Sequence, residues 1–203
     1  TEYLKKLIDA FPKNHPLKRY RGDVYYDAQN LQKLFSAMKR EGWTTAFLNK
    51  KIEDYRESLE DDEKLVYKRN SGSNKKGDKK PDYYKAVDRA EKLQAAVSEF
   101  DKYQLILQQN RRYDFDDMIN WVIKAFEENN NLLAEFQERY QYILVDEFQD
   151  TSGTQNRIVQ LLINFWERPN VFVVGDDDQS IYRFQGASVE NMLDFANNYV
   201  ADL

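Results

Sequence analysis

The spacing of apolar residues in the first half of the chain predicts helices. Apolar side chains recur three and four positions apart after Asp27 and stop before Gly42, which predicts a helix that Asp27 begins and Gly42 ends. The same spacing predicts a longer charged helix from about Thr45 and another from Pro81 to about Gln109. The apolar positions are Leu31, Leu34, Phe35 and Met38 in the first helix, Phe47, Leu48, Ile52, Tyr55 and Leu59 in the second, and Val87, Ala90, Val97, Phe100 and Leu107 in the third. Residues 1–112 are therefore expected to form a mostly helical subdomain.

Residues 70–80 interrupt this helical pattern. The segment has no apolar residue and contains several turn formers. We interpret it as a mobile loop or a linker between two of the helices.

The pattern changes near Tyr113. A helical stripe runs from Phe115 to Phe126, residues 129–131 are three asparagines that break it, and a short helix follows. Two short continuous apolar runs come next, at residues 142–145 and 171–174, and a helical pattern with apolar residues at 158, 161, 162 and 165 lies between them. Two apolar strands joined by a helix are typical of a βαβ unit with buried parallel strands. The sequence therefore predicts an α/β fold in residues 113–203, with a parallel sheet and flanking helices.

Charge divides the chain in the same place. Residues 1–112 contain 25 Lys and Arg against 18 Asp and Glu, a net charge of +7, whereas residues 113–203 contain 5 against 17, a net charge of -12. A basic half beside an acidic half suggests polyanion contact in one and cation-assisted chemistry in the other, although two solvated surfaces would give the same counts. The chain has no cysteine, which excludes disulfides and thiolate metal sites. It has one histidine, His15, which argues against a histidine-based metal site or catalytic triad.

An acidic pair follows the first predicted strand. Asp146 and Glu147 come directly after Val145, and ligands of parallel sheets bind beyond the carboxyl ends of the strands. One carboxylate there can hold Mg²⁺ through its waters, and the other can accept a proton from an attacking water. A bare Asp-Glu pair at a strand end is more often a solubility feature, so this pair alone does not define a site.

A second polar cluster follows the second predicted strand. Gly175 permits a tight exit from the strand, and Gln179 offers an amide that can contact both a phosphate oxygen and a water. Tyr182, Arg183 and Phe184 form an aromatic-basic-aromatic run of the kind that stacks exposed bases and holds a backbone phosphate. Taken alone, such a run is more often core packing.

Together the two clusters resemble motifs II and III of the UvrD/Rep/PcrA-like superfamily 1 DNA helicases. The matching runs are Asp-Glu-Phe-Gln-Asp-Thr at residues 146–151 and the run from Gly175 to Ala187, in the family's order and spacing and each after a strand. The run at residues 114–119 also resembles this family. The match covers residues 113 to about 195. Residues 1–112 match only by position, as the helical insertion of the first RecA-like domain, and are a candidate for DNA contact. The resemblance implies that residues 113–203 are the C-terminal part of that domain, with a partial RecA-like parallel sheet.

The resemblance implies roles for the residues that bind and cleave nucleotide. Asp146 is expected to hold the water shell of Mg²⁺, Glu147 to activate the hydrolytic water, and Gln179 to sense the γ-phosphate. The residues expected to support these groups are Gln149, Asp150, Thr151 and Asp176. In the intact protein this implies an ATP-dependent DNA helicase that uses ATP and Mg²⁺.

The resemblance also implies how DNA is held. Tyr182 and Phe184 are expected to lie against single-stranded bases, with Arg183 beside them, and Phe184 stands where the family usually has Trp. Gln185 stands where Arg is common, which removes a charged contact. The partners implied are single-stranded and duplex DNA, ATP, and the remainder of the same polypeptide, without a membrane. Unwinding in the 3′-to-5′ direction, a role in DNA repair and a cytoplasmic location, at the nucleoid in a bacterium, are implied by the family alone.

A phosphate-binding loop is missing from this chain. The loop needs a Gly-Lys-Thr/Ser sequence, and the seven glycines are followed by Asp, Trp, Ser, Asp, Thr, Asp and Ala. The second RecA-like domain, which supplies arginines to the γ-phosphate, would lie after Leu203. We therefore expect that the chain alone neither binds ATP or Mg²⁺ tightly nor hydrolyses ATP.

Two other readings stay open on the sequence. A two-metal nuclease or polymerase palm could use Asp146, Glu147, Asp150 and Asp176, although it has no need of the run at residues 179–184. A non-catalytic DNA-binding or interaction module could use residues 1–112 as its active part. Cleavage of DNA with Mg²⁺ and without ATP would favour the nuclease, and the flanking coding sequence would separate a helicase from a module.

Overall fold

The computed structural model describes residues 2–70, 72 and 74–176. The chain forms two compact units, which we call the helical unit (Thr1–Phe35 with Trp43–Arg112) and the sheet unit (Ser36–Gly42 with Tyr113–Leu203). The first part of helix α2 (Ala28–Glu41) belongs to the helical unit, and its last part, from Ser36, belongs to the sheet unit. It begins directly after Asp27 and ends at Gly42, whose φ of +67° suits glycine, so the predicted helix is confirmed.

The helical unit buries the apolar faces that the sequence predicts. Its other α-helices are α1 (Glu2–Asp9), α3 (Thr45–Asp61), α4 (Pro81–Ser98) and α5 (Phe100–Gln109). Leu31 and Phe35 of α2 and Val97 of α4 are buried, and the ring of Phe35 packs against the rings of Phe100 and Tyr103. Burial of such side chains drives the packing of these helices.

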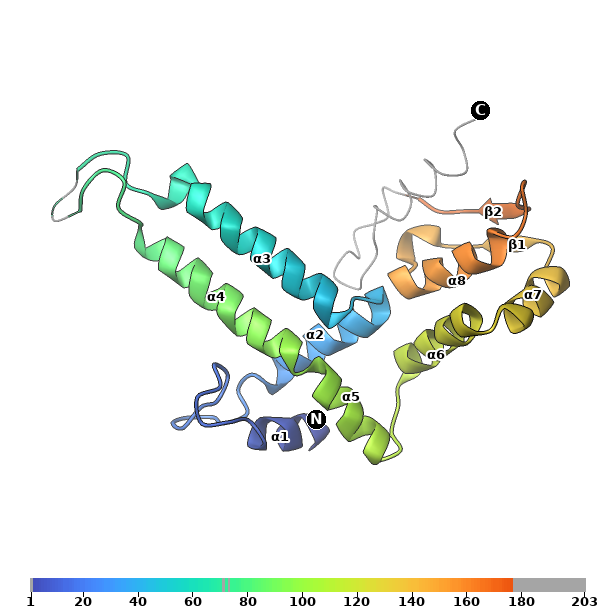
Figure 1. The fold of residues 1–203 in the computed structure, drawn as a ribbon, viewed down its shortest axis with the longest axis horizontal. Helices are drawn as coiled ribbons and strands as arrows, with labels where there is room; N and C mark the ends of the chain where they lie inside the picture. Colours follow the sequence, from blue (N-terminus) through green and yellow to red (C-terminus); the bar gives the residue numbers. More distant parts are fainter. Residues whose placement is uncertain (1, 71, 73, 177–203) are drawn as a thin grey trace. The chain divides into compact units, whose positions relative to one another are not determined.

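Helices α3 and α4 lie side by side as a hairpin (Figure 1). Thr44 starts α3 by accepting a hydrogen bond from the Phe47 N–H, and Pro81 occupies the first turn of α4. A short 3₁₀ helix (Glu63–Leu65) and an isolated antiparallel bridge between Val66 and Lys79 lie between them. The described part of residues 70–80 is thus a loop at the tip of this hairpin, as the sequence predicts.

The single helix predicted from Pro81 to Gln109 is wrong, because α4 and α5 meet at Glu99. The Glu99 N–H bonds to the carbonyls of Ala96 and Val97, which tightens the last turn and ends α4. The buried Glu99 carboxylate lies 3.5 Å from Nε2 of His15 and 2.8 Å from Nζ of Lys102. This carboxylate at the break contacts His15, which is distant in sequence, and local periodicity does not indicate such a contact.

The sheet unit follows the predicted order of elements. It contains α6 (Phe115–Glu128), α7 (Asn130–Arg139), β1 (Ile143–Val145), a 3₁₀ helix (Phe148–Asp150), α8 (Gly153–Ile163) and β2 (Val171–Val173). Asn129 ends α6 and starts α7 by accepting a hydrogen bond from the Leu132 N–H, so the predicted break at the asparagine run is confirmed.

Strands β1 and β2 are parallel, with Val145 opposite Val173. This confirms the predicted βαβ unit and an α/β organisation of the sheet unit. One face of the pair, formed by Ile143, Val145, Val171 and Val173, packs with the buried side chains of Phe148 and Ile163. On the other face Leu144 and Phe172 are 76% and 64% exposed.

Candidate active site

The two acidic segments leave the sheet at the same edge. The Val174 N–H donates to the Val145 carbonyl at 2.9 Å, and the Phe148 N–H donates back to the Val174 carbonyl at 2.9 Å. These two hydrogen bonds extend the pairing just past the strands. The residues that follow β1 are thereby held beside the residues that follow β2, as the position of the two clusters in the sequence predicts.

Glu147 occupies a sharp turn at this edge. Its backbone is left-handed, with φ 49° and ψ 45°, a conformation that costs a non-glycine residue of order 1–2 kcal/mol. Two hydrogen bonds hold it there, because Asp146 Oδ1 accepts from the Glu147 N–H at 2.9 Å and the Glu147 carbonyl accepts from the Asp150 N–H at 2.8 Å. The turn leaves the Glu147 side chain exposed while the next residue, Phe148, enters the core.

The supporting residues of the first cluster hold the 3₁₀ turn. Gln149 is buried, and its Nε2 donates to Oε2 of Glu147 at 2.6 Å. The Thr151 hydroxyl donates to the Phe148 carbonyl at 2.7 Å, and Asp150 is exposed. Asp176 is exposed, and its backbone N–H donates to Oε1 of Gln149 at 3.1 Å. The structure therefore brings Glu147, Gln149 and the backbone of Asp176 together.

The role of Asp146 as a Mg²⁺ ligand stays a prediction. Its side chain is exposed at the carboxyl end of β1, and its Oδ1 accepts a hydrogen bond from the Glu147 N–H. A single carboxylate that contacts the ion through water suits Mg²⁺, which dehydrates reluctantly and keeps several waters.

Four predicted site residues, and Gln185 beside them, lie outside the described residues. The four are Gln179 of the nucleotide site and Tyr182, Arg183 and Phe184 of the DNA site. Within the described part of the chain, His, Cys, Asp and Glu side chains form no group of three that could hold a metal ion.

A buried ion cluster, which the sequence reading missed, lies in the sheet unit. Lys39 at the end of α2 is 3% exposed, and its Nζ lies 2.8 Å from Oδ2 of Asp114 and 2.9 Å from Oδ2 of Asp117. The two aspartates also cap α6, because each accepts a hydrogen bond from the backbone N–H of the other. The sequence does contain one signal that Lys39 is buried, because Lys39 follows Phe35 by four positions and so shares the buried face of the helix.

The charges of this cluster stabilise one another. Burial alone would lower the pKa of the Lys39 ammonium, but its hydrogen bonds to Asp114 and Asp117 raise that pKa above its ordinary value. Burial would raise the pKa of Asp114, yet the hydrogen bonds from Lys39 and Asp117 and the positive charge of Lys39 together hold that pKa below its ordinary value. Burial and the negative charge of Asp114 raise the pKa of the neighbouring Asp116.

Replacing Lys39 by Met should lower the free energy of unfolding of the sheet unit by about 3–5 kcal/mol, because the change leaves buried carboxylate charge without its partner. Urea unfolding of the 203-residue chain measures this. A Trp43→Phe background confines the tryptophan fluorescence to Trp121 and Trp166, which both lie in the sheet unit.

Lys33→Met is the matched control, because Lys33 is an exposed lysine on the same helix and its loss should change the free energy of unfolding by no more than about 0.5 kcal/mol. The pKa of Asp114 is lower in the folded chain than in the unfolded chain. Its contribution to the free energy of unfolding is therefore fully present above the unfolded pKa and is lost as pH falls through the folded pKa. The difference between wild type and Lys39→Met should therefore shrink in acid. Equal effects of the two Met variants at neutral pH would contradict this account.

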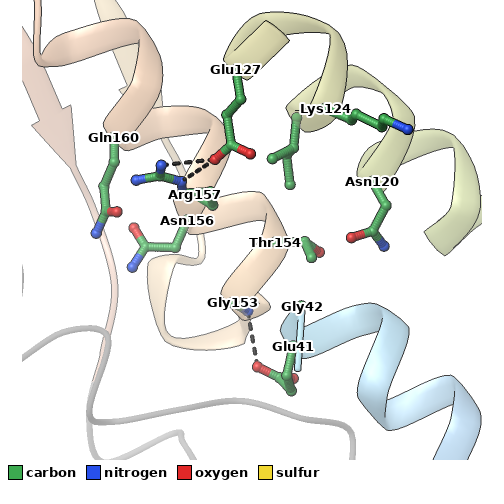
Figure 2. A pocket seen from close by; sticks show the side chains of 11 residues that line it. Glu41, Gly42, Asn120, Lys124, Glu127, Gly153, Thr154, Asn156, Arg157 and Gln160 are labelled. Carbon is green, nitrogen blue, oxygen red and sulfur yellow. Dashed lines mark hydrogen bonds and ion pairs between the residues drawn. The ribbon is translucent and has the colours of Figure 1, made fainter. Parts of the chain in front are cut away.

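A polar pocket of about 510 Å³ lies between the end of α2, α6 and α8, all within the sheet unit (Figure 2). Arg157 of α8 pairs with Glu127 of α6 at 2.8 Å, and the Gly153 N–H donates to Oε2 of Glu41 at 3.0 Å. The Thr154 hydroxyl donates to the Arg40 carbonyl at 2.7 Å. Of the predicted site residues that the structure describes, none lines this pocket. Its contacts join the start of α8, which closely follows the turn at Glu147, to the end of α2.

The family model described as UvrD/REP helicase N-terminal domain matches residues 5–200. The match covers nearly the whole chain, including both strand-end clusters. The chain therefore belongs to the UvrD/REP helicase family, and the resemblance inferred from residues 146–151 and 175–187 is confirmed.

Curated relatives include proteins named ATP-dependent DNA helicase PcrA. The protein of Leuconostoc citreum is 42% identical over 119 residues, which is 58% of this chain and 15% of the relative. Those of Staphylococcus epidermidis and Staphylococcus aureus are 42% identical over 106 residues, which is 52% of this chain and 14% of each relative. The matched part thus spans about a seventh of the length of these relatives.

Among the helices that the structure describes, none is both long enough and apolar enough to cross a membrane.

Proposed function

We propose that this chain is part of the motor of an ATP-dependent DNA helicase that moves along single-stranded DNA and unwinds duplexes in the 3′-to-5′ direction. The observation that carries the proposal is the edge where β1 and β2 end, which presents Asp146 and Glu147 beside Gly175 and Asp176 in a chain of the UvrD/REP family. The names of the PcrA relatives support ATP and DNA as the ligands.

The sheet unit is proposed to be the second half of a RecA-like domain. Parallel sheets are normally covered on both faces, but Leu144 and Phe172 leave one face of this strand pair exposed and apolar. Further strands and helices of a longer polypeptide would cover that face. The short share of each relative that this chain matches agrees with such a longer polypeptide.

The proposed reaction is hydrolysis of the bond between the β- and γ-phosphates of ATP. The oxygen of a water attacks the γ-phosphorus, a proton of that water passes to the Glu147 carboxylate, and ADP leaves with the electron pair of the broken P–O bond. The exposed Glu147 carboxylate, held by the Gln149 amide at 2.6 Å, is suited to accept this proton. Asp146 would hold Mg²⁺ through its waters, and the ion would neutralise charge on the phosphates.

The segment after β2 is proposed to hold DNA and to sense nucleotide. Gln179 would contact the γ-phosphate, and Tyr182 and Phe184 would stack on single-stranded bases with Arg183 at the backbone. The closeness of these residues in the sequence offers a short route from the nucleotide to the DNA.

The helical unit is proposed to contact the DNA backbone through the tip of the α3–α4 hairpin. Lys75 and Lys76 are exposed there, and Lys79 and Lys80 follow them near the start of α4. Such lysines make phosphate contacts that are weak, indifferent to sequence and sensitive to salt.

The test is ATP turnover by the full-length protein that contains this chain, measured with and without single-stranded DNA. We expect turnover that requires Mg²⁺ and rises when single-stranded DNA is added. Mg²⁺-dependent cleavage of DNA without ATP would favour the nuclease instead. DNA binding by a full-length protein that turns over no ATP would favour the non-catalytic module.

A further inference from the structure

The side chain of Gln149 joins the two strand-end segments of the candidate site. Its Nε2 donates to Oε2 of Glu147 at 2.6 Å, and its Oε1 accepts from the backbone N–H of Asp176 at 3.1 Å. The first partner belongs to the turn after β1, and the second follows β2. One amide therefore connects the carboxylate proposed as the general base to the end of the other strand.

The chemistry of the two partners fixes the orientation of this amide. An ionised carboxylate only accepts hydrogen bonds and a backbone N–H only donates them, so the NH₂ group must face Glu147 and the oxygen must face Asp176. Gln149 is 2% exposed, and in such a buried place a hydrogen bond to a charged group is stronger than in water. Both ends of the amide are thus used, and rotating it would break both contacts.

Gly175 provides the space that this connection needs. A Cβ added at Gly175 would lie 2.6 Å from Oε1 of Gln149, and 3.2 Å and 3.3 Å from the backbone nitrogens of Gln149 and Phe148. The first distance is well inside van der Waals contact, so a side chain at position 175 would displace the amide. The Gln149 amide beside the end of β2 therefore requires a glycine at position 175.

The hydrogen bond from Gln149 restricts the exposed side chain of Glu147. Glu147 is exposed, and a glutamate on the surface samples several rotamers. Fixing Oε2 leaves the other carboxylate oxygen, Oε1, in a defined place from which it can accept a proton. Catalytic groups that are held in this way react faster, since a small misplacement can lower the rate about 100-fold.

We propose that Gln149 is a positioning residue, which orients the Glu147 carboxylate for proton transfer and ties that orientation to the end of β2 at Asp176. This inference rests on the proposed ATP hydrolysis. The residues that follow Asp176 in the sequence include Gln179 and Tyr182, so displacement of the end of β2 by nucleotide or DNA would act on the general base through one amide.

The test is steady-state ATP hydrolysis by the full-length protein carrying Gln149→Met, which keeps the size of the side chain and removes both hydrogen bonds. We expect kcat with saturating single-stranded DNA to fall about 10- to 100-fold while KM for ATP changes less than about threefold. The matched control is Gln137→Met, because Gln137 is also a buried glutamine of the sheet unit and donates to the Leu161 carbonyl at 2.8 Å. That variant should keep kcat within about twofold of wild type.

A double variant distinguishes positioning from a general loss of structure. If Gln149 acts through Glu147, then Gln149→Met combined with Glu147→Gln should be no slower than Glu147→Gln alone, because the group to be positioned is already lost. Independent effects would multiply instead. Multiplying effects, equal losses in the two Met variants, or an unchanged kcat in Gln149→Met would each overturn the proposal.

A second variant keeps the test decisive if Gln149→Met does not fold. Gly175→Ala keeps Gln149 but puts a Cβ 2.6 Å from its Oε1, so the amide must move. We expect kcat to fall about 10- to 100-fold while KM for ATP changes less than about threefold, with no further fall when Glu147→Gln is added. An unchanged kcat overturns the proposal. Wild-type activity and its loss in Glu147→Gln, measured in the same series, establish separately whether the proposed hydrolysis itself is correct.

Discussion

In the full-length protein, Glu147→Gln is expected to lower the rate of ATP hydrolysis by about 10²- to 10⁴-fold and to leave ATP binding nearly unchanged. The amide cannot accept the proton of the attacking water, and a lost general base has an effect of this size. The substitution nearly preserves shape at an exposed position, so the melting temperature should hardly move. Steady-state ATP turnover and equilibrium binding of a fluorescent nucleotide measure the two quantities.

The control for this variant is Glu135→Gln, which removes an exposed carboxylate from α7 of the same unit. It should turn over ATP at the wild-type rate. If Glu147→Gln also turned over ATP at the wild-type rate, Glu147 would be an acidic residue at a strand end and nothing more.

The 203-residue chain on its own is expected to show no ATP hydrolysis above background. None of its glycines is followed by lysine, so it contains no Gly-Lys phosphate loop to position the triphosphate. Losing the positioning of the phosphates together with the arginines expected from a second motor domain should lower the rate by several powers of ten. A coupled assay of ADP release, with the full-length protein measured beside it, tests this.

Two controls make that result interpretable. Circular dichroism should show that the isolated chain is helical, so that a missing activity is not the result of unfolding. The same chain with Glu147→Gln identifies contaminating ATPases, since their activity survives the substitution. DNA-stimulated turnover that the isolated chain shows and its Glu147→Gln variant lacks would contradict the prediction.

The βαβ unit could be predicted from the sequence because its signals are local. A run of apolar residues, a helix of period 3.6 and a second run suffice to indicate parallel strands, and Asp146 and Glu147 then fall at the carboxyl edge by topology. The resemblance at residues 146–151 needed only the order of residues. The pairing of Val145 with Val173 confirms that part of the prediction.

The contacts that could not be predicted join residues far apart in the chain. Lys39 reaches Asp114 across 75 residues, and the Glu99 carboxylate at the helix break lies 3.5 Å from Nε2 of His15, which is distant in sequence. Periodicity reports which face of a helix is buried, but not which distant group it meets. The contact between Gln149 and Asp176 could not be predicted either, because it depends on the register of β1 and β2.

Strand separation by the full-length protein is the measurement that tests the central claim most directly. The substrate is a fluorescently labelled duplex with a single-stranded tail, presented in two forms with a 3′ or a 5′ tail. The account predicts that wild type separates the 3′-tailed duplex with ATP and Mg²⁺, and that neither wild type with ADP nor Glu147→Gln with ATP does so. Cutting of the labelled strand without ATP, or a wild type that separates neither duplex while binding both, would contradict it.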